Sequence, residues 1–156
     1  MEDNKTVLIE EIHKEIDLIQ SCISRMAQNS FMIKGWLITI YAVVLALLPE
    51  KIDLLLLCIV MAIVTWSFWY LDGFFLRTEK IYRSIYNWVL IERPKGNRKL
   101  LYQLNSQLFK DIIEPTESIA KIMKSKTLIT FYGIPFLFVI IIVFIQILPY
   151  ICNLCK

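Results

Sequence analysis

The distribution of apolar residues predicts three long helices. Apolar runs of 18 residues cover positions 31–48, 54–71 and 128–145, and Lys34 is the only charged residue within them. An 18-residue helix is about 27 Å long, close to the ~30 Å of a bilayer's hydrocarbon core. Backbone groups in lipid must bond within their own segment, so the runs predict spanning helices and not strands. We expect an all-α integral membrane protein; buried helices of a soluble protein are the alternative.

The N-terminal segment carries an apolar stripe at helical spacing. Its residues follow one another at intervals of 3, 4, 3, 4 and 3: Ile9, Ile12, Ile16, Ile19, Ile23 and Met26. This pattern predicts an amphipathic helix that either self-associates or packs on its own chain. No proline or glycine lies between Met26 and Lys34, so we expect the helix to continue into the first span.

The segment between the second and third apolar runs predicts a layer of further helices. One helix should follow span two and end near Glu92, because Pro94 disfavours helical geometry in the residue before it. A second is expected over 100–113, where leucines and isoleucines share a face, and a third should begin at Pro115 and Thr116 and lead into span three. The expected organisation is a cytoplasmic N-terminal helix (1–30), a transmembrane hairpin (31–76), a cytoplasmic helical segment (77–126) and a third transmembrane helix (127–152).

Composition and charge support this picture and orient it. The chain of 156 residues is 57% hydrophobic, above the ~45–50% of ordinary soluble domains. Eleven of its 17 lysines and arginines lie between spans two and three, and only Lys51 lies between spans one and two. The positive-inside rule then predicts a cytoplasmic N-terminus and an external C-terminus. The acidic N-terminal residues do not resemble a cleavable signal peptide.

The sequence offers little for catalysis. The only histidine, His13, has no nucleophile or second metal ligand at a recognisable spacing, and we expect it on the surface. Cys22 and Cys58 fall in different predicted environments, while Cys152 and Cys155 near the C-terminus could form a structural or intersubunit disulfide or have no role. We expect no enzyme activity, no cofactor and no metal.

Lys34 and Asp72 are the charged positions of greatest interest. The turn between spans one and two is centred near residue 51, so Lys34 lies ~17 residues before it and Asp72 ~21 after it. In an antiparallel hairpin both residues then lie near the cytoplasmic interface, within ~6 Å of each other along the axis. Charges at such depth are costly unless paired and often mark functional positions. In the alternatives, Lys34 extends to the lipid headgroups, and Asp72 caps the hairpin or pairs with Arg77.

Other polar residues lie within the spans. The pore-lining candidates are Thr39, Tyr41, Thr65, Ser67, Thr130 and Gln146. Such groups line narrow water paths or join helices by hydrogen bonds, and three spans require an oligomer to enclose a path. Gly133 and Pro135 should locally loosen span three.

A basic turn is the candidate ligand site. Its cations are Arg93, Lys95, Arg98 and Lys99. They either attract anionic lipid headgroups or bind a phosphate-rich ligand such as a nucleotide or single-stranded oligonucleotide, with nearby tyrosines and Trp88 available for stacking.

Residues 19–36 and 69–88 resemble small bacterial membrane proteins of antiphage-defence loci. The stretches read Ile19-Gln20-Ser21-Cys22-Ile23-Ser24-Arg25-Met26-Ala27-Gln28-Asn29-Ser30-Phe31 with Lys34-Gly35-Trp36, and Trp69-Tyr70-Leu71-Asp72-Gly73-Phe74-Phe75-Leu76-Arg77-Thr78-Glu79-Lys80. The layout is similar to SLATT-type effectors and to the membrane effector of Hailong-type systems.

The resemblance implies an oligomeric, gated channel or pore that disrupts the bacterial inner membrane on infection, controlled by a nucleotidyltransferase, its oligonucleotide product or another cytoplasmic sensor. The implied gate or interface positions are Arg25, Asn29, Ser30, Lys34, Gly35, Asp72, Arg77 and Glu79. The competing function is a non-conducting membrane anchor or assembly subunit that docks a soluble partner.

Overall fold

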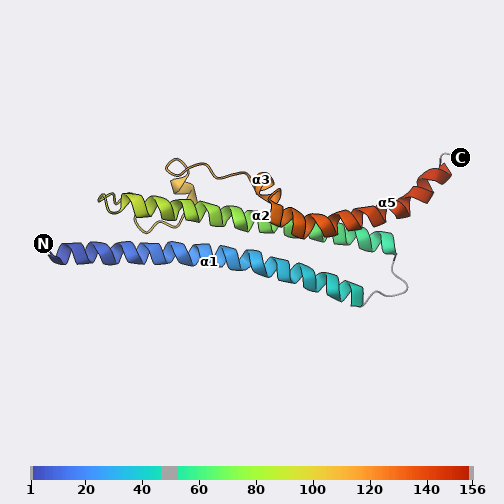
Figure 1. Cartoon of the computed structure of the whole chain (residues 1–156), viewed down its shortest axis with the longest axis horizontal. Helices are drawn as coiled ribbons and strands as arrows, with labels where there is room; N and C mark the ends of the chain where they lie inside the picture. The colour runs from blue at the N-terminus through green and yellow to red at the C-terminus, as the bar shows by residue number, and fades with distance from the viewer. Residues whose placement is uncertain (1, 47–52, 155–156) are drawn as a thin grey trace. The chain divides into compact units, whose positions relative to one another are not determined.

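The computed structural model describes the backbone of residues 2–46 and 53–154. Most of these residues are helical, turns and loops connect the helices, and none of the described residues forms a strand. The elements in chain order are α1 (Glu2–Ala46), α2 (Leu54–Glu92), the 3₁₀ helix η1 (Ser106–Phe109), α3 (Ile119–Met123), α4 (Lys126–Leu128), the π-helix η2 (Ile129–Gly133) and α5 (Ile134–Leu154) (Figure 1). Within the described parts of the chain, three stretches are long and apolar enough to cross a membrane: Ile9–Ala46, Leu54–Glu92 and Lys126–Gln146.

Helices α1 and α2 are each continuous. The prediction that the N-terminal helix runs on into the first apolar run is confirmed, because α1 has no break up to Ala46. The helix expected after span two is the C-terminal part of α2, and it ends at Glu92 as the position of Pro94 predicted. Both helices contribute to two compact units.

The first unit consists of Met1–Asn29 and Phe75–Ser118. Its core is formed by Ile19 of α1, Ile85 and Val89 of α2, and Phe109 of η1, with the Phe109 ring edge-on to Trp88 at 5.6 Å between centroids. Ile16 and Ile23 pack against the same core, so this part of the N-terminal stripe packs on its own chain. Self-association through other parts of the stripe stays a prediction.

The helix predicted over 100–113 is wrong. Only η1 is helical there, and Leu100 and Tyr102 have φ values of +56° and +59°. Left-handed backbone at two residues that are not glycine prevents an α-helix. The helix predicted from Pro115 and Thr116 is also wrong in its start and extent, since α3 begins at Ile119 and ends at Met123.

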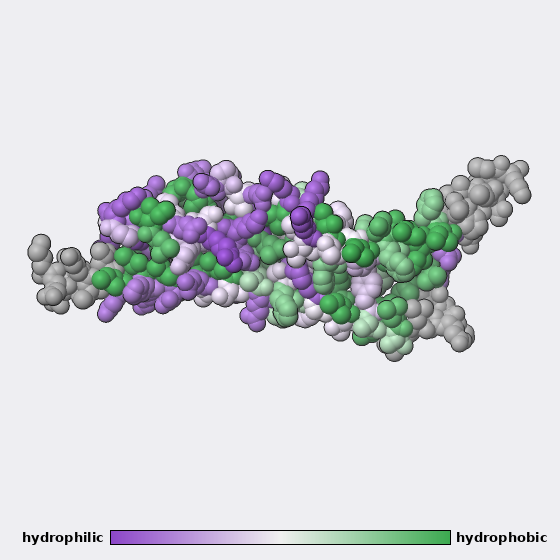
Figure 2. All heavy atoms as spheres, in the orientation of Figure 1, coloured by the Kyte–Doolittle hydropathy of each residue, from purple (hydrophilic) through white to green (hydrophobic). Residues whose placement is uncertain are grey.

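The second unit consists of Ser30–Phe74 and Ile119–Lys156. Its core joins three helices: Cys58 and Met61 of α2 and Val139 of α5 are buried together, and Ile40 and Val44 of α1 pack against them. Its outer surface is strongly apolar, and Figure 2 shows hydrophobic residues over much of the face in view. Among the residues of this unit whose side chains the structure describes, ten large hydrophobic side chains are at least 60% exposed: Phe31, Trp36, Leu45, Leu56, Ile63, Ile134, Leu137, Phe138, Phe144 and Ile145. This surface is compatible with lipid.

The π-helix η2 interrupts the start of the third apolar helix. In a regular α-helix the residue at 135 would donate a hydrogen bond to the carbonyl of Phe131, but Pro135 has no N–H. A π-turn just before a proline changes the bonding pattern where that bond is missing. The expected loosening near Gly133 and Pro135 therefore takes the form of η2.

Candidate functional site

The second unit contains a buried carboxylate. Asp72 of α2 is fully buried and forms an ion pair with Lys34 of α1. Ser30 of α1 donates a hydrogen bond to Asp72 Oδ1, and the Tyr132 hydroxyl of η2 donates to Oδ2 at 2.9 Å. We call these four residues the Asp72 cluster. The predicted proximity of Lys34 and Asp72 is confirmed by their ion pair.

Ser30 and Lys34 lie one turn apart on α1 and share the carboxylate. The Lys34 ammonium donates to Ser30 Oγ at 2.9 Å and lies 3.4 Å from the Ser30 carbonyl oxygen. Ser30 is buried, whereas the Lys34 side chain retains 21% of its exposure. Within the cluster, Asp72 is therefore inaccessible to solvent, whereas Lys34 is partly accessible.

Tyr132 is the member that the sequence analysis missed. It is fully buried in η2, stacks on the Trp69 ring at 6.2 Å between centroids, and reaches Asp72 from 60 residues away. Trp69 is fixed in turn by its indole N–H, which donates to the Met123 carbonyl at 3.1 Å. The available signal was a phenol within an apolar run, because a buried tyrosine hydroxyl requires a partner.

Burial of the Asp72 carboxylate removes its hydration, which costs free energy. A carboxylate in an apolar interior is stable only when a counter-ion and hydrogen-bond donors compensate for lost hydration. Among the described residues, every buried side-chain nitrogen or oxygen atom has a hydrogen-bond partner. The Asp72 cluster is thus a polar site whose buried atoms all have hydrogen-bond partners, in a unit whose helices are mainly apolar.

The remaining gate candidates lie outside this cluster. Gly35 is exposed on α1 of the second unit. In the first unit, Arg77 donates to the Glu117 carbonyl at 3.1 Å, and buried Glu79 pairs with Arg83 at 2.7 Å. Arg25, which contacts Cys22 Sγ at 3.4 Å, and Asn29 also belong to the first unit. Of the eight candidates, the structure gathers Ser30, Lys34 and Asp72.

Most pore-lining candidates bond within the chain. Thr39, Ser67 and Thr130 are exposed, and each donates to the carbonyl four residues earlier in its helix, at 3.0, 2.8 and 2.8 Å respectively. Tyr41 and buried Thr65 bond to each other at 2.7 Å and so join α1 to α2, which favours helix packing for this pair. Gln146 is exposed on α5. A pore-lining role for these residues stays a prediction.

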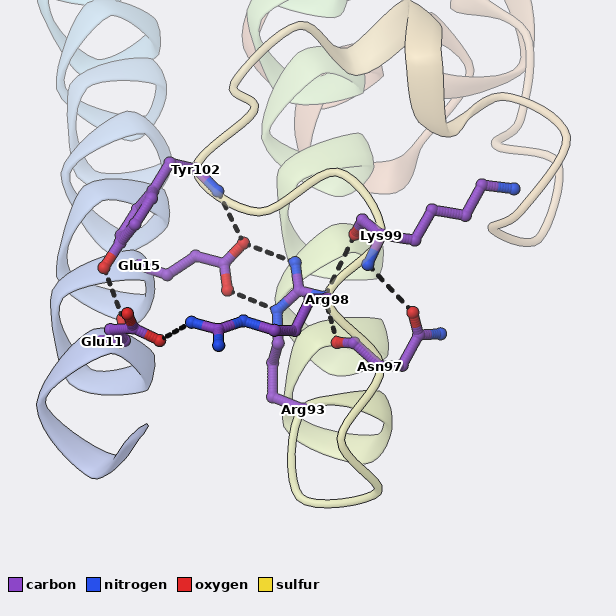
Figure 3. Close-up of polar contacts among 7 residues, drawn as sticks. All are labelled: Glu11, Glu15, Arg93, Asn97, Arg98, Lys99 and Tyr102. Atoms are coloured by element: carbon purple, nitrogen blue, oxygen red, sulfur yellow. Dashed lines mark hydrogen bonds and ion pairs between the residues drawn. The ribbon is translucent and has the colours of Figure 1, made fainter. Parts of the chain in front are cut away.

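The basic turn of the first unit folds around Arg93. Arg93 is 2% exposed, and its guanidinium donates two hydrogen bonds to the Glu15 carboxylate of α1, of 2.6 and 2.7 Å (Figure 3). The Arg93 Nη1 atom donates to the carbonyl oxygens of Asn97 and Lys99, at 2.6 and 3.1 Å. The group also lies over the Trp88 ring at 5.2 Å. These contacts give Arg93 a structural role in place of the ligand contact predicted for it.

The other three cations of the turn are exposed. Lys95 pairs with Glu92 at 2.7 Å, and Arg98 pairs with Glu11 of α1 (Figure 3). Asn97 and Lys95 donate to the Glu92 carboxylate, and these bonds, that of Asn97 first, lower the pKa of Glu92. Ligand binding by Lys95, Arg98 and Lys99 stays a prediction.

The thiols and the histidine that the structure describes lie in different environments. Cys22 and Cys58 are buried free thiols, and His13 is exposed on α1. The question of a bond between Cys152 and Cys155 lies outside the described side chains. Comparison with protein-family models, curated proteins and solved structures found no match. The function is therefore inferred from the contacts of this chain.

Proposed function

We propose that the protein is an integral membrane protein with three spans. The support is the length of the three apolar stretches and the exposed apolar surface of the second unit. We place the N-terminus and the first unit in the bacterial cytoplasm and the C-terminus outside, on the distribution of lysines and arginines.

Within that membrane protein, we propose a gated ion pathway formed by several copies of the chain. The observation that carries this proposal is Asp72, a fully buried carboxylate held by Lys34, Ser30 and Tyr132 among apolar helices. Ionisable groups at membrane depth are expensive and typically serve ion or substrate pathways. Three spans cannot enclose a wide pore, so the pathway requires a homo-oligomer.

The proposed trigger acts on the cytoplasmic unit. Lys95, Arg98 and Lys99 are exposed cations, two of them in ion pairs on the surface of the first unit. A nucleotide, an oligonucleotide or an acidic partner surface would compete for them, since phosphates bind lysine and arginine through charge-assisted hydrogen bonds. The resemblance of residues 19–36 and 69–88 to defence effectors supports a membrane-disrupting role upon infection.

Single-channel recording in planar bilayers tests this proposal. Purified wild-type protein should give discrete openings, and single-stranded oligonucleotides on the side of the first unit should change the open probability. Lys34→Ala and Asp72→Asn should alter conductance or gating, whereas Lys80→Ala, which removes a surface pair with Glu117, should not. If both cluster variants conduct like wild type, the gate is elsewhere.

A non-conducting anchor is the second candidate. Its support is the hydrogen bonding of Thr39, Ser67 and Thr130 to their own helices, which leaves these hydroxyls satisfied without a water path. Silent bilayers, with insertion verified and nucleotide ligands present, would favour the anchor.

A further inference from the structure

The Lys34 ammonium lies in a cage of oxygen atoms. Ser30 contributes two of them, its Oγ at 2.9 Å and its carbonyl oxygen at 3.4 Å from Nζ, and Asp72 contributes Oδ2 through the ion pair. The Tyr132 hydroxyl donates to that same Oδ2 and orients the carboxylate. The cage is thus built from side-chain and backbone oxygen atoms of α1 and α2 and supported by η2.

This set of ligands has the chemistry of a monovalent-cation site. Carbonyl, hydroxyl and carboxylate oxygens replace the hydration shell of alkali cations in proteins, and hard cations prefer oxygen ligands. The cage contains one carboxylate, so a single positive charge neutralises it, as the Lys34 ammonium now does. An ammonium group and a potassium ion are close in size and form similar contacts with oxygen.

The cage is also accessible by the route that Lys34 occupies. Asp72 is completely buried, whereas the Lys34 side chain is 21% exposed. Lysine is a flexible chain that can move its charged end toward water while its stem stays on apolar surface. If the ammonium withdraws along this route, the negative charge of the Asp72 carboxylate is left without a counter-ion. A small cation bound by the three oxygen atoms can then neutralise it.

We propose that the Asp72 cluster is a monovalent-cation site in which Lys34 is a tethered occupant that competes with free sodium or potassium. The proposal deepens the proposed ion pathway, on which its physiological meaning rests, by naming the ion class and the ligands Ser30 and Asp72. Entry of the cation and withdrawal of Lys34 are one exchange, so the carboxylate never remains uncompensated.

Removal of the tethered charge tests the site directly. Lys34→Met keeps the apolar stem and deletes the ammonium, so the cage must take a free cation or remain unpaired. The variant is purified in detergent, and its melting temperature is measured in sodium, potassium or N-methylglucamine chloride, each at about 150 mM so that screening is equal. N-methylglucamine is too large for the cage and serves as the reference cation.

The expected result is a cation-specific stabilisation of this one variant. Lys34→Met should melt about 3 to 5 °C higher in sodium or potassium than in N-methylglucamine, the shift given by occupancy of one site at roughly tenfold excess over its dissociation constant. Wild type, in which Lys34 fills the cage, should shift by less than about 1 °C, as should the double variant Lys34→Met/Asp72→Asn. Lys80→Met deletes an exposed ammonium and is the matched control.

Two results would overturn the proposal. One is an equal melting temperature of Lys34→Met in all three salts. The other is a cation shift of the same size in the double variant, which would locate the bound cation elsewhere. Should Lys34→Met fail to fold, Lys34→Gln is measured in the same way; folding of either variant only in sodium or potassium supports the site, and failure of both in all three salts contradicts it.

The assay is independent of conduction. Cation-specific stabilisation with silent bilayers would retain the site and reject the channel. Discrete openings without stabilisation of Lys34→Met would do the reverse.

Discussion

Two ion pairs with a buried carboxylate, both among the described residues, are built in different ways. In the first unit, Glu15 and Arg93 are both 2% exposed, and Arg93 also binds two backbone carbonyls of its own turn. In the second unit, Asp72 is fully buried, but its cation is a lysine with 21% exposure. Both side chains of the first pair are buried, whereas the cation of the second pair is partly exposed.

This difference separates a structural site from one that can change state. The planar guanidinium of arginine fits a carboxylate through two parallel bonds, and its remaining donors fix the loop at Asn97 and Lys99. The ammonium of lysine is a point charge on a flexible stem and can be exchanged for another cation. We therefore expect mutations of the first pair to affect folding and those of the second to affect function as well.

The largest effect is expected from breaking the Glu15–Arg93 pair. Arg93→Ala or Glu15→Ala should lower the free energy of unfolding by about 3 to 5 kcal/mol, because each leaves the opposite charge buried and unpaired. Equilibrium unfolding in detergent measures this loss.

The double variant Glu15→Leu/Arg93→Leu sharpens that test. It removes both charges, so it should recover part of the stability that either single variant loses. The surface pair Lys95–Glu92 provides the control, and Lys95→Ala should cost less than about 1 kcal/mol. Single variants with wild-type stability would refute the structural role of Arg93.

Substitution of Lys34 should lower the free energy of unfolding more than substitution of Asp72 does. Lys34→Ala leaves a fully buried carboxylate and should cost about 3 kcal/mol in N-methylglucamine chloride, whereas Asp72→Asn leaves a partly exposed ammonium that can reach water and should cost about 1 to 2 kcal/mol. The same unfolding measurement compares the two. Equal losses would show that Lys34 is held as firmly as Arg93.

The sequence predicts the parts of the molecule that depend on local pattern. Three apolar runs locate the long helices, and counting from the turn near residue 51 brings Lys34 and Asp72 together, because helix rise converts residue number into depth. Pro94 marks the end of α2 for an equally local reason.

The rest depends on contacts between distant residues. Leu101, Leu104, Leu108 and Ile112 have helical spacing, yet the segment is a turn and a 3₁₀ helix, because Arg93 binds the carbonyls of Asn97 and Lys99, and Leu100 is left-handed. Glu15 pairs with Arg93 across 78 residues. Its position on the apolar stripe, three residues after Ile12 and four before Ile19, was the available signal.

One tyrosine in each unit tests whether the charge of Asp72 strengthens the hydrogen bond that it accepts. The Tyr132 hydroxyl donates to the Asp72 carboxylate at 2.9 Å, whereas the Tyr82 hydroxyl donates to the neutral Leu104 carbonyl at 3.0 Å. Tyr132→Phe should cost about 2 kcal/mol and Tyr82→Phe about 1 kcal/mol, since hydrogen bonds to charged groups are the stronger. Denaturant titrations of both variants measure the difference. A larger loss in Tyr82→Phe would contradict the view that Tyr132 orients a charged carboxylate.

The smallest expected effect is a pH dependence at the exposed rim of the basic turn. Hydrogen bonds from Asn97 and then from Lys95 lower the pKa of Glu92 in the folded protein, so the folded state favours the ionised form. The contribution is complete above the unfolded-state value of 4.5 and is lost as the pH falls below it toward the folded-state pKa. The carbon-13 shift of the Glu92 carboxyl, assigned with Glu92→Gln, follows this titration in detergent micelles. Asn97→Ala and Lys95→Ala should each raise the Glu92 pKa, because each removes a hydrogen bond to the ionised carboxylate, and an unchanged pKa in either variant would contradict the role of that bond.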